Sequence, residues 1–183
     1  MKLQRRPARR TRGQAVVEFA LASIVLFLLI TAVVDLGLMF LTYQTMISAV
    51  KEGLSYGAYR PVEPNPVNPS SPLANDANIR YRIRHSNIDP ATGEPSISFI
   101  NLGDLNHNDL DDEGEAGVLG QYLAISAYQD SSPSTACATR TRNCWLRIDM
   151  RYDYHFIFPL APVFGDTFEI HVVRDQQIIR SAQ

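Results

Sequence analysis

Residues 19–41 read FALASIVLFLLITAVVDLGLMFL, an apolar run in which Asp35 is the only charged side chain. A helix needs about 20 apolar residues to cross the hydrocarbon core of a membrane, which is about 30 Å thick. This run supplies 23 residues. A soluble helix of this apolarity would need burial on every side, which a chain of 183 residues can hardly provide. The run therefore predicts one membrane-spanning helix.

The distribution of charge around this run predicts its orientation. Residues 1–12 carry six basic side chains and no acid, whereas the rest of the chain has 11 basic and 19 acidic residues. Basic flanks stay in the cytoplasm, so we expect a single-pass protein of the inner (cytoplasmic) membrane with an extracytoplasmic C-terminal domain. A basic tail that grips phosphates is the alternative, but the apolar run follows it at once, so we expect no nucleic-acid partner. A cleaved secretory signal would have a shorter apolar part, about 7–15 residues, ending in small residues.

Apolar residues continue at helical spacing beyond the membrane as far as Leu54, and Pro61 ends the pattern. The sequence thus predicts one helix over residues 14–59, with the membrane span at about residues 19–41. Five prolines then follow within residues 60–72, a composition typical of an extended, semi-rigid linker.

The remaining residues, 73–183, have the pattern of a strand-rich extracytoplasmic domain. Apolar and charged side chains alternate over residues 146–154, which indicates a half-buried strand, and a shorter alternation covers residues 79–83. Further candidate strands are Ser96–Asn101, Tyr122–Tyr128 and Thr167–Val173. We therefore predict an α+β fold. A basic cytoplasmic leader, residues 1–13, precedes a long transmembrane helix that extends outside the membrane and a small antiparallel β-sheet domain.

Three stretches of the chain resemble a known family: RGQAVVEFAL at residues 12–21, VVDLG at 33–37 and YQTMISAVKEGLSYGAY at 43–59. The first looks like the prepilin signal of type IV-like pilins. Over residues 13–55 the chain is more closely similar to the TadE-like proteins, minor pseudopilins of the tight-adherence (Flp-type) pilus system. The resemblance implies a pilin-like shape, in which an apolar helix carries a small folded head.

The resemblance also implies a processing signal made of Gly13, Gln14, Glu18 and Phe19. A membrane prepilin peptidase would cut after Gly13, leaving Gln14 as the new N-terminus and Glu18 as the fifth residue. Cleavage would remove all six leader cations. It would also create an α-amino group that the Glu18 carboxylate of a neighbouring subunit can pair with inside the membrane. In the alternative, Glu18 lies in the headgroup region of an uncut anchor.

Asp35 is a second acidic residue within the apolar region. It follows Glu18 by 17 residues, which is about 25 Å along a helix axis and less than the thickness of the hydrocarbon core. Both carboxylates therefore cannot lie outside the core on a straight helix in an undisturbed bilayer. Either one of them is paired, protonated or satisfied by a partner, or the bilayer thins locally and the side chain reaches its surface.

The two cysteines, Cys137 and Cys144, lie close together in the predicted extracytoplasmic domain. Outside the cytoplasm such a pair indicates one disulfide, here closing an eight-residue loop. A bridge of this kind stabilises a fold by roughly 2–3 kcal/mol in the loop-entropy model. Redox-active pairs usually have two intervening residues rather than six, so we interpret this disulfide as structural.

Residues 104–115 read DLNHNDLDDEGE and contain the one candidate metal site. Its oxygen-bearing side chains have the ligand spacing of a calcium loop. However, an aspartate stands where the turn glycine belongs, and a second replaces the usual apolar eighth residue. A solvated acidic loop is the alternative, and no other cofactor is expected. The candidate calcium ligands are Asp104, Asn106, Asn108, Asp112 and Glu115.

No catalytic motif is evident, and the four histidines are scattered without metal-ligand spacing. We therefore expect a structural and assembly protein, not an enzyme, with no small-molecule substrate. The resemblance implies as partners membrane lipid, other pilin or pseudopilin subunits, a prepilin peptidase and a pilus assembly platform. One alternative is a permanently anchored binding or adhesion module that is neither processed nor polymerised. Another is an anchored hydrolase assembled from distant Asp, Glu and His side chains.

Overall fold

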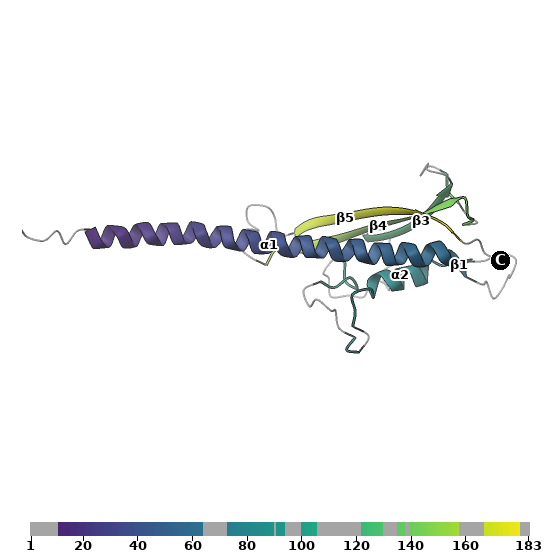
Figure 1. Cartoon of the computed structure of the whole chain (residues 1–183), viewed down its shortest axis with the longest axis horizontal. Coiled ribbons are helices and arrows are strands. Elements are labelled where there is room, and N and C mark those ends of the chain that lie inside the picture. The colour runs from purple at the N-terminus through teal and green to yellow at the C-terminus, as the bar shows by residue number, and fades with distance from the viewer. Residues whose placement is uncertain are drawn as a thin grey trace, which may run out of the picture.

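The computed structural model of the chain describes residues 11–63, 73–89, 91–93, 100–105, 122–129, 135–137, 140–157 and 167–179. A 49-residue helix, α1 (Thr11–Tyr59), runs the length of the molecule, about 73 Å at 1.5 Å per residue. It ends where Arg60 and Pro61 predicted. Figure 1 shows that the N-terminal half of α1 projects alone, while its C-terminal half lies along the folded domain.

The domain is built on a three-stranded antiparallel sheet in the order β3 (Leu123–Gln129), β4 (Cys144–His155) and β5 (Thr167–Gln177). The three strands confirm those predicted around residues 122–128, 146–154 and 167–173. Residues of β4 alternate between buried and half-exposed along the whole strand, because successive side chains point to opposite faces of a sheet. The predicted α+β class, with a long apolar helix before a small antiparallel sheet, is confirmed.

The buried face of the sheet packs directly on the C-terminal half of α1. One hydrophobic cluster contains Met46, Val50 and Leu54 of the helix together with Leu146 and Ile148 of β4. All five side chains are at most 3 % exposed. The outer part of α1 is therefore an internal element of the domain, because it supplies one side of the hydrophobic core.

A second helix, α2 (Asp76–Arg84), lies beside α1 (Figure 1), and its apolar side chains join the same hydrophobic cluster as the buried face of the sheet. The prediction of a strand over residues 79–83 is therefore wrong. Ile79 and Ile83 alternate with basic residues, but they are also four residues apart, so both point to one face of a helix. Both are fully buried. Asp76 in the first turn and Arg84 in the last turn further favour the helix through its dipole.

The two ends of the proline-rich linker lie side by side. Two short strands, β1 (Val62–Glu63) and β2 (Leu73–Ala74), pair antiparallel, and the amide of Asn75 donates to the carbonyl of Pro61 at 3.2 Å. Residues 64–72 of the linker lie outside the described residues, as does most of the candidate strand Ser96–Asn101. This pairing places the beginning of α2 beside the end of α1.

An ion pair and a disulfide hold the same end of the domain together. The guanidinium of Arg140 donates hydrogen bonds to Oδ2 of Asp76 at 2.9 Å and to the carbonyl of Pro61 at 3.2 Å, and it forms an ion pair with Oδ1 of Asp76 at 2.7 Å. Arg140 is only 6 % exposed. The predicted disulfide between Cys137 and Cys144 is present, with the Cα atoms 6.1 Å apart. These bonds tie the loop before β4 to the first turn of α2.

Close contact between α1 and its neighbours depends on two glycines in the sequence Gly53-Leu-Ser-Tyr-Gly57. A Cβ atom at Gly53 would overlap Ile83 of α2, and its distance to Cδ1 of that residue would be 2.7 Å. A Cβ atom at Gly57 would overlap Leu146 of β4 and lie 2.8 Å from Cδ1 of Ile79. Because real Cβ atoms do not approach other atoms this closely, a side chain at either position would force Ile79, Ile83 or Leu146 to shift.

We predict that Gly57→Val lowers the free energy of unfolding by about 1–3 kcal/mol, because the added side chain overpacks the contact between α1, α2 and β4. Gly37→Val is the matched control, since the same change on the same helix meets nothing within 4 Å. Thermal unfolding of both proteins in detergent, followed by circular dichroism, measures the difference. Equal stability of the two variants would contradict this account of the packing.

Candidate functional site

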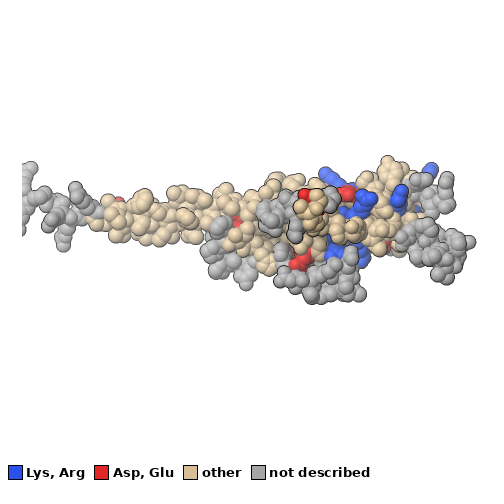
Figure 2. Space-filling model, turned by 90° about the horizontal axis from the view of Figure 1, so that it is seen from below, with Lys and Arg blue, Asp and Glu red and all other residues tan. Residues whose placement is uncertain are grey.

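The projecting half of α1 exposes an apolar surface to its surroundings. Phe19 is 74 % exposed and Phe27 is 71 % exposed. The hydroxyls of Ser23 and Thr31 donate to carbonyls of their own helix, at 2.8 and 2.9 Å, so neither needs water as a partner. Among the described residues, α1 is the one helix long and apolar enough to cross a membrane. In Figure 2 this part of the molecule is almost free of charged atoms, whereas Lys and Arg gather over the folded end.

The candidate processing residues lie at the beginning of this surface. Gly13, Gln14, Glu18 and Phe19 belong to the first turns of α1, and all four are exposed. The side-chain amide of Gln14 donates to the Glu18 carboxylate at 3.0 Å, one helical turn away. The helix therefore brings Gln14 and Glu18 together, and it leaves both side chains accessible from outside the molecule.

Asp35 differs from Glu18 because its own chain buries it. Only 1 % of Asp35 is exposed. Its carboxylate accepts a hydrogen bond from the backbone N–H of Ile157 at 3.1 Å, and the hydroxyl of Tyr154 donates to its backbone carbonyl at 3.3 Å. The sequence left open whether Asp35 has a hydrogen-bonding partner. The structure supplies one within the same chain, at the end of β4 and just beyond it. Sequence reasoning could not identify this pair, because the two positions are 122 residues apart.

Tyrosines at this end of β4 are buried against the helix. Burial raises the pKa of Tyr154 to about 12, and the negative charge of Asp35 adds to the shift. Burial also raises the pKa of Tyr152 to about 12. Both phenols therefore favour the neutral form in the folded protein. At the end of the sheet nearest the projecting helix, Tyr154 lies against Asp35 and its ring also contacts that of Phe156.

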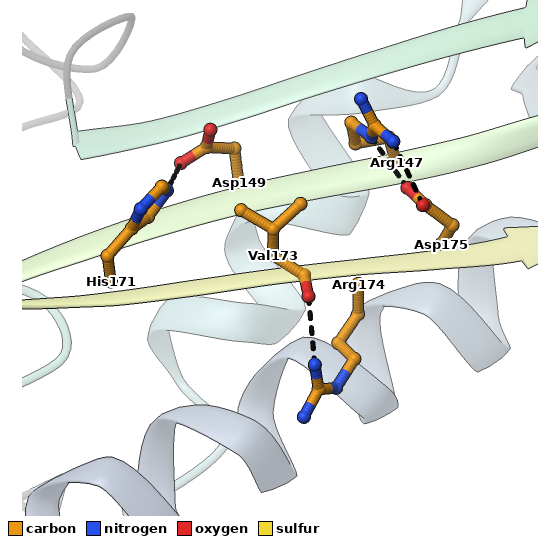
Figure 3. Close-up of polar contacts among 6 residues, drawn as sticks. All are labelled: Arg147, Asp149, His171, Val173, Arg174 and Asp175. Atoms are coloured by element: carbon orange, nitrogen blue, oxygen red, sulfur yellow. Dashed lines mark hydrogen bonds and ion pairs between the residues drawn. The ribbon is translucent and has the colours of Figure 1, made fainter. Parts of the chain in front are cut away.

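The other face of the sheet is charged and open to solvent. Arg147 on β4 donates two hydrogen bonds to Asp175 on β5, at 2.7 and 3.0 Å, and the imidazole of His171 lies 2.8 Å from Asp149 (Figure 3). The guanidinium of Arg147 also lies 5.0 Å from the ring centre of Tyr128. Hydrogen bonds from Arg147 lower the pKa of Asp175. This face is the hydrated side of the domain, and the alternating charges of β4 were its signal in the sequence.

The candidate calcium loop lies mostly outside the described residues. Asp104 is described and is 9 % exposed, whereas Asn106, Asn108, Asp112 and Glu115 are not. Within the part of the chain that the structure describes, no three His, Cys, Asp or Glu side chains are grouped to hold a metal ion. Calcium binding stays a prediction from the sequence.

A shallow hollow lies at the end of the sheet away from the projecting helix. Its described lining has no acidic or basic side chain, and its cysteine is in the disulfide. These residues therefore offer no general base for catalysis. The lining consists of Gln129, Thr141, Asn143, Cys144, Trp145 and Gln177.

These features define a class of protein: an α+β protein of pilin-like layout, with one apolar N-terminal helix consistent with single-pass membrane anchoring. The family model described as TadE-like protein matches residues 13–54, which confirms the resemblance read from the sequence. The matched segment contains Glu18 and Asp35 and ends beside Gly53. No curated protein and no solved structure significantly matches the chain.

We predict that Asp35→Ala lowers the free energy of unfolding by about 1–3 kcal/mol, because the backbone N–H of Ile157 loses its acceptor in a buried position. Asp35→Asn is the matched control, since it keeps an oxygen at the same place without the charge. Thermal unfolding in detergent measures both changes. An Asn variant as unstable as the Ala variant would show that the charge, not the acceptor, holds the end of β4.

We predict that stability falls as the pH rises from about 10 to about 12. Tyrosines of the unfolded chain release their phenol protons near pH 10, whereas Tyr152 and Tyr154 in the folded protein keep theirs to about pH 12. Their contribution to the free energy of unfolding is therefore complete below pH 10 and is lost as the pH rises to about 12. Tyr154→Phe should flatten this decline. Tyr81→Phe is the control, because Tyr81 is 55 % exposed. Melting temperatures measured across this pH range test the prediction. The decline of melting temperature with pH must be smaller for Tyr154→Phe than for Tyr81→Phe.

Proposed function

We propose that this protein is a TadE-like minor pseudopilin, a membrane-anchored structural component of a tight-adherence pilus or a related secretion machine. One observation carries the proposal. The segment that matches the family, residues 13–54, coincides with the exposed apolar helix and its attachment to the folded head. A rod with a small head, held in the membrane, suits a subunit that acts by packing beside other rods.

The two acidic residues of the rod have different roles in this proposal. Asp35 is satisfied within the chain, so it needs no second subunit. Glu18 is exposed, and its carboxylate accepts a hydrogen bond from the Gln14 amide of its own helix. A carboxylate in lipid costs a few kcal/mol unless it is paired, so Glu18 is the residue that favours a charged partner in the membrane. The α-amino group of a neighbouring processed subunit is such a partner.

Cleavage after Gly13 prepares the rod for assembly. The leader places six cations at the cytoplasmic surface, and these cations oppose any movement of the helix out of the membrane. Their removal releases that constraint and creates the amine. The partners in this proposal are a prepilin peptidase, a pilus assembly platform, membrane lipid and other pilin subunits. The protein itself is structural and catalyses no reaction.

We predict that the chain loses residues 1–13 when it is produced with an active prepilin peptidase from its host. Gly13→Leu should block the cleavage, because a bulky side chain obstructs the extended backbone that a peptidase requires. Gly37→Leu, the same change further along the helix, should be processed normally. Intact-mass spectrometry of the wild type and both variants shows whether residues 1–13 are still attached. An uncut wild-type chain beside an active peptidase would favour the permanently anchored adhesion module instead.

We predict that Glu18→Ala is still processed and folded but assembles poorly, with incorporation reduced by about tenfold or more. The loss follows because the amine of a neighbouring subunit would lack its partner in lipid. Glu52→Ala is the matched control, since Glu52 lies on the same helix but its ion pair with Arg82, at 3.8 Å, is exposed. Quantitative immunoblotting of sheared pili measures incorporation. Wild-type incorporation of the Glu18→Ala protein would contradict the proposed pairing.

A further inference from the structure

The end of the sheet nearest the projecting half of α1 exposes apolar side chains. Ile157, just beyond β4, is 57 % exposed, and Phe168 on β5 is 50 % exposed. Phe168 lies opposite Tyr154 in the sheet, and both Tyr154 and Ile157 are hydrogen-bonded to Asp35. These contacts place Ile157 and Phe168 at the level of Asp35 along the helix. We call this pair of side chains the sheet tip.

The helix exposes apolar side chains at the same level. Leu36 is 57 % exposed and Phe40 is 59 % exposed, on the turns that follow Asp35. By contrast, the solvent face of the sheet carries a cross-strand ion pair, Arg147–Asp175, and a polar contact between His171 and Asp149 (Figure 3). The sheet tip and this part of α1 thus both expose apolar side chains at the level where the folded domain begins, and we call them together the apolar rim.

The length of the apolar helix indicates what covers this rim. Phe19–Val34 is 16 residues and spans about 24 Å, shorter than the hydrocarbon core of about 30 Å. If the inner boundary of the core is near Phe19, the outer boundary must fall four or so residues beyond Val34. The outer surface of the membrane then lies at the level of Asp35 and the apolar rim, and not closer to the N-terminus of the helix.

We infer that the sheet tip inserts into the outer leaflet of the bilayer, so that the domain rests on the membrane through Ile157 and Phe168 as well as through α1. This inference depends on the proposed membrane anchoring. It also explains how Asp35 is tolerated at this depth, because Tyr154 and the backbone of Ile157 separate its carboxylate from lipid. His155 and Thr167, which are exposed nearby, are polar groups that the headgroup region accepts.

The single tryptophan of the chain makes the inference measurable. Trp145 lies at the opposite end of β4, nine residues from Tyr154, which is about 30 Å along a strand. In proteoliposomes of bromine-labelled phosphatidylcholine, the wild-type emission should therefore stay unquenched. In a Trp145→Phe background, Ile157→Trp and Phe168→Trp should each lose about half of their emission or more, with lipids brominated near the headgroup acting most strongly.

A third protein separates this inference from the proposed anchoring. Phe27→Trp, also in the Trp145→Phe background, lies within the apolar helix and should be quenched most by lipids brominated deep in the chain. If it is not quenched, the anchoring itself fails. If it is quenched while Ile157→Trp and Phe168→Trp are not, only the sheet-tip inference is overturned. In a third outcome, bromine does not quench the emission at either tip position, but the emission changes with the protein-to-lipid ratio. That result would show that a second copy of the protein covers the tip, and it would also overturn the sheet-tip inference.

Discussion

The fold depends on how closely α1 can approach the elements around it. Its outer half packs against both the sheet and α2, and at Gly53 and Gly57 the side chains of both neighbours occupy the space that a Cβ atom would fill. With this approach, Met46, Val50 and Leu54 reach the same hydrophobic cluster as the buried face of β4. A three-stranded sheet with one short helix could bury little apolar surface without α1. The helix is therefore both the apolar rod that projects from the domain and one side of the domain's hydrophobic core.

One helix must consequently satisfy two environments, and Asp35 marks the change between them. Before it, apolar side chains are exposed on all sides of α1, a pattern consistent with a helix that faces lipid. After it, buried and exposed positions alternate with the helical period, as expected of a helix packed on a domain. The end of β4 closes over Asp35 at this point. The hydrogen bonds of Asp35 to Tyr154 and Ile157 thus join the helix directly to the end of the sheet.

Much of the architecture was predictable because its signals are local. The apolar run, the proline after residue 60, the alternation in β4 and the close spacing of Cys137 and Cys144 each depend on neighbouring residues. The exception is residues 79–83, where alternation and helical spacing coincide over too short a stretch to be distinguished. Ile79 and Ile83 form a helix because only one face can pack against Gly53 and Gly57, and that contact is not visible in the segment itself.

The sequence by itself determined the class of the molecule: a basic N-terminal segment, one apolar helix similar to that of TadE-like proteins and a small sheet with a disulfide. These properties follow from composition and period, which any stretch of chain carries independently of the rest. Tertiary structure alone decided that Asp35 is satisfied inside the chain while Glu18 is exposed. The two carboxylates are alike in the sequence. They differ because Tyr154 and Ile157, more than a hundred residues later, fold back onto only one of them.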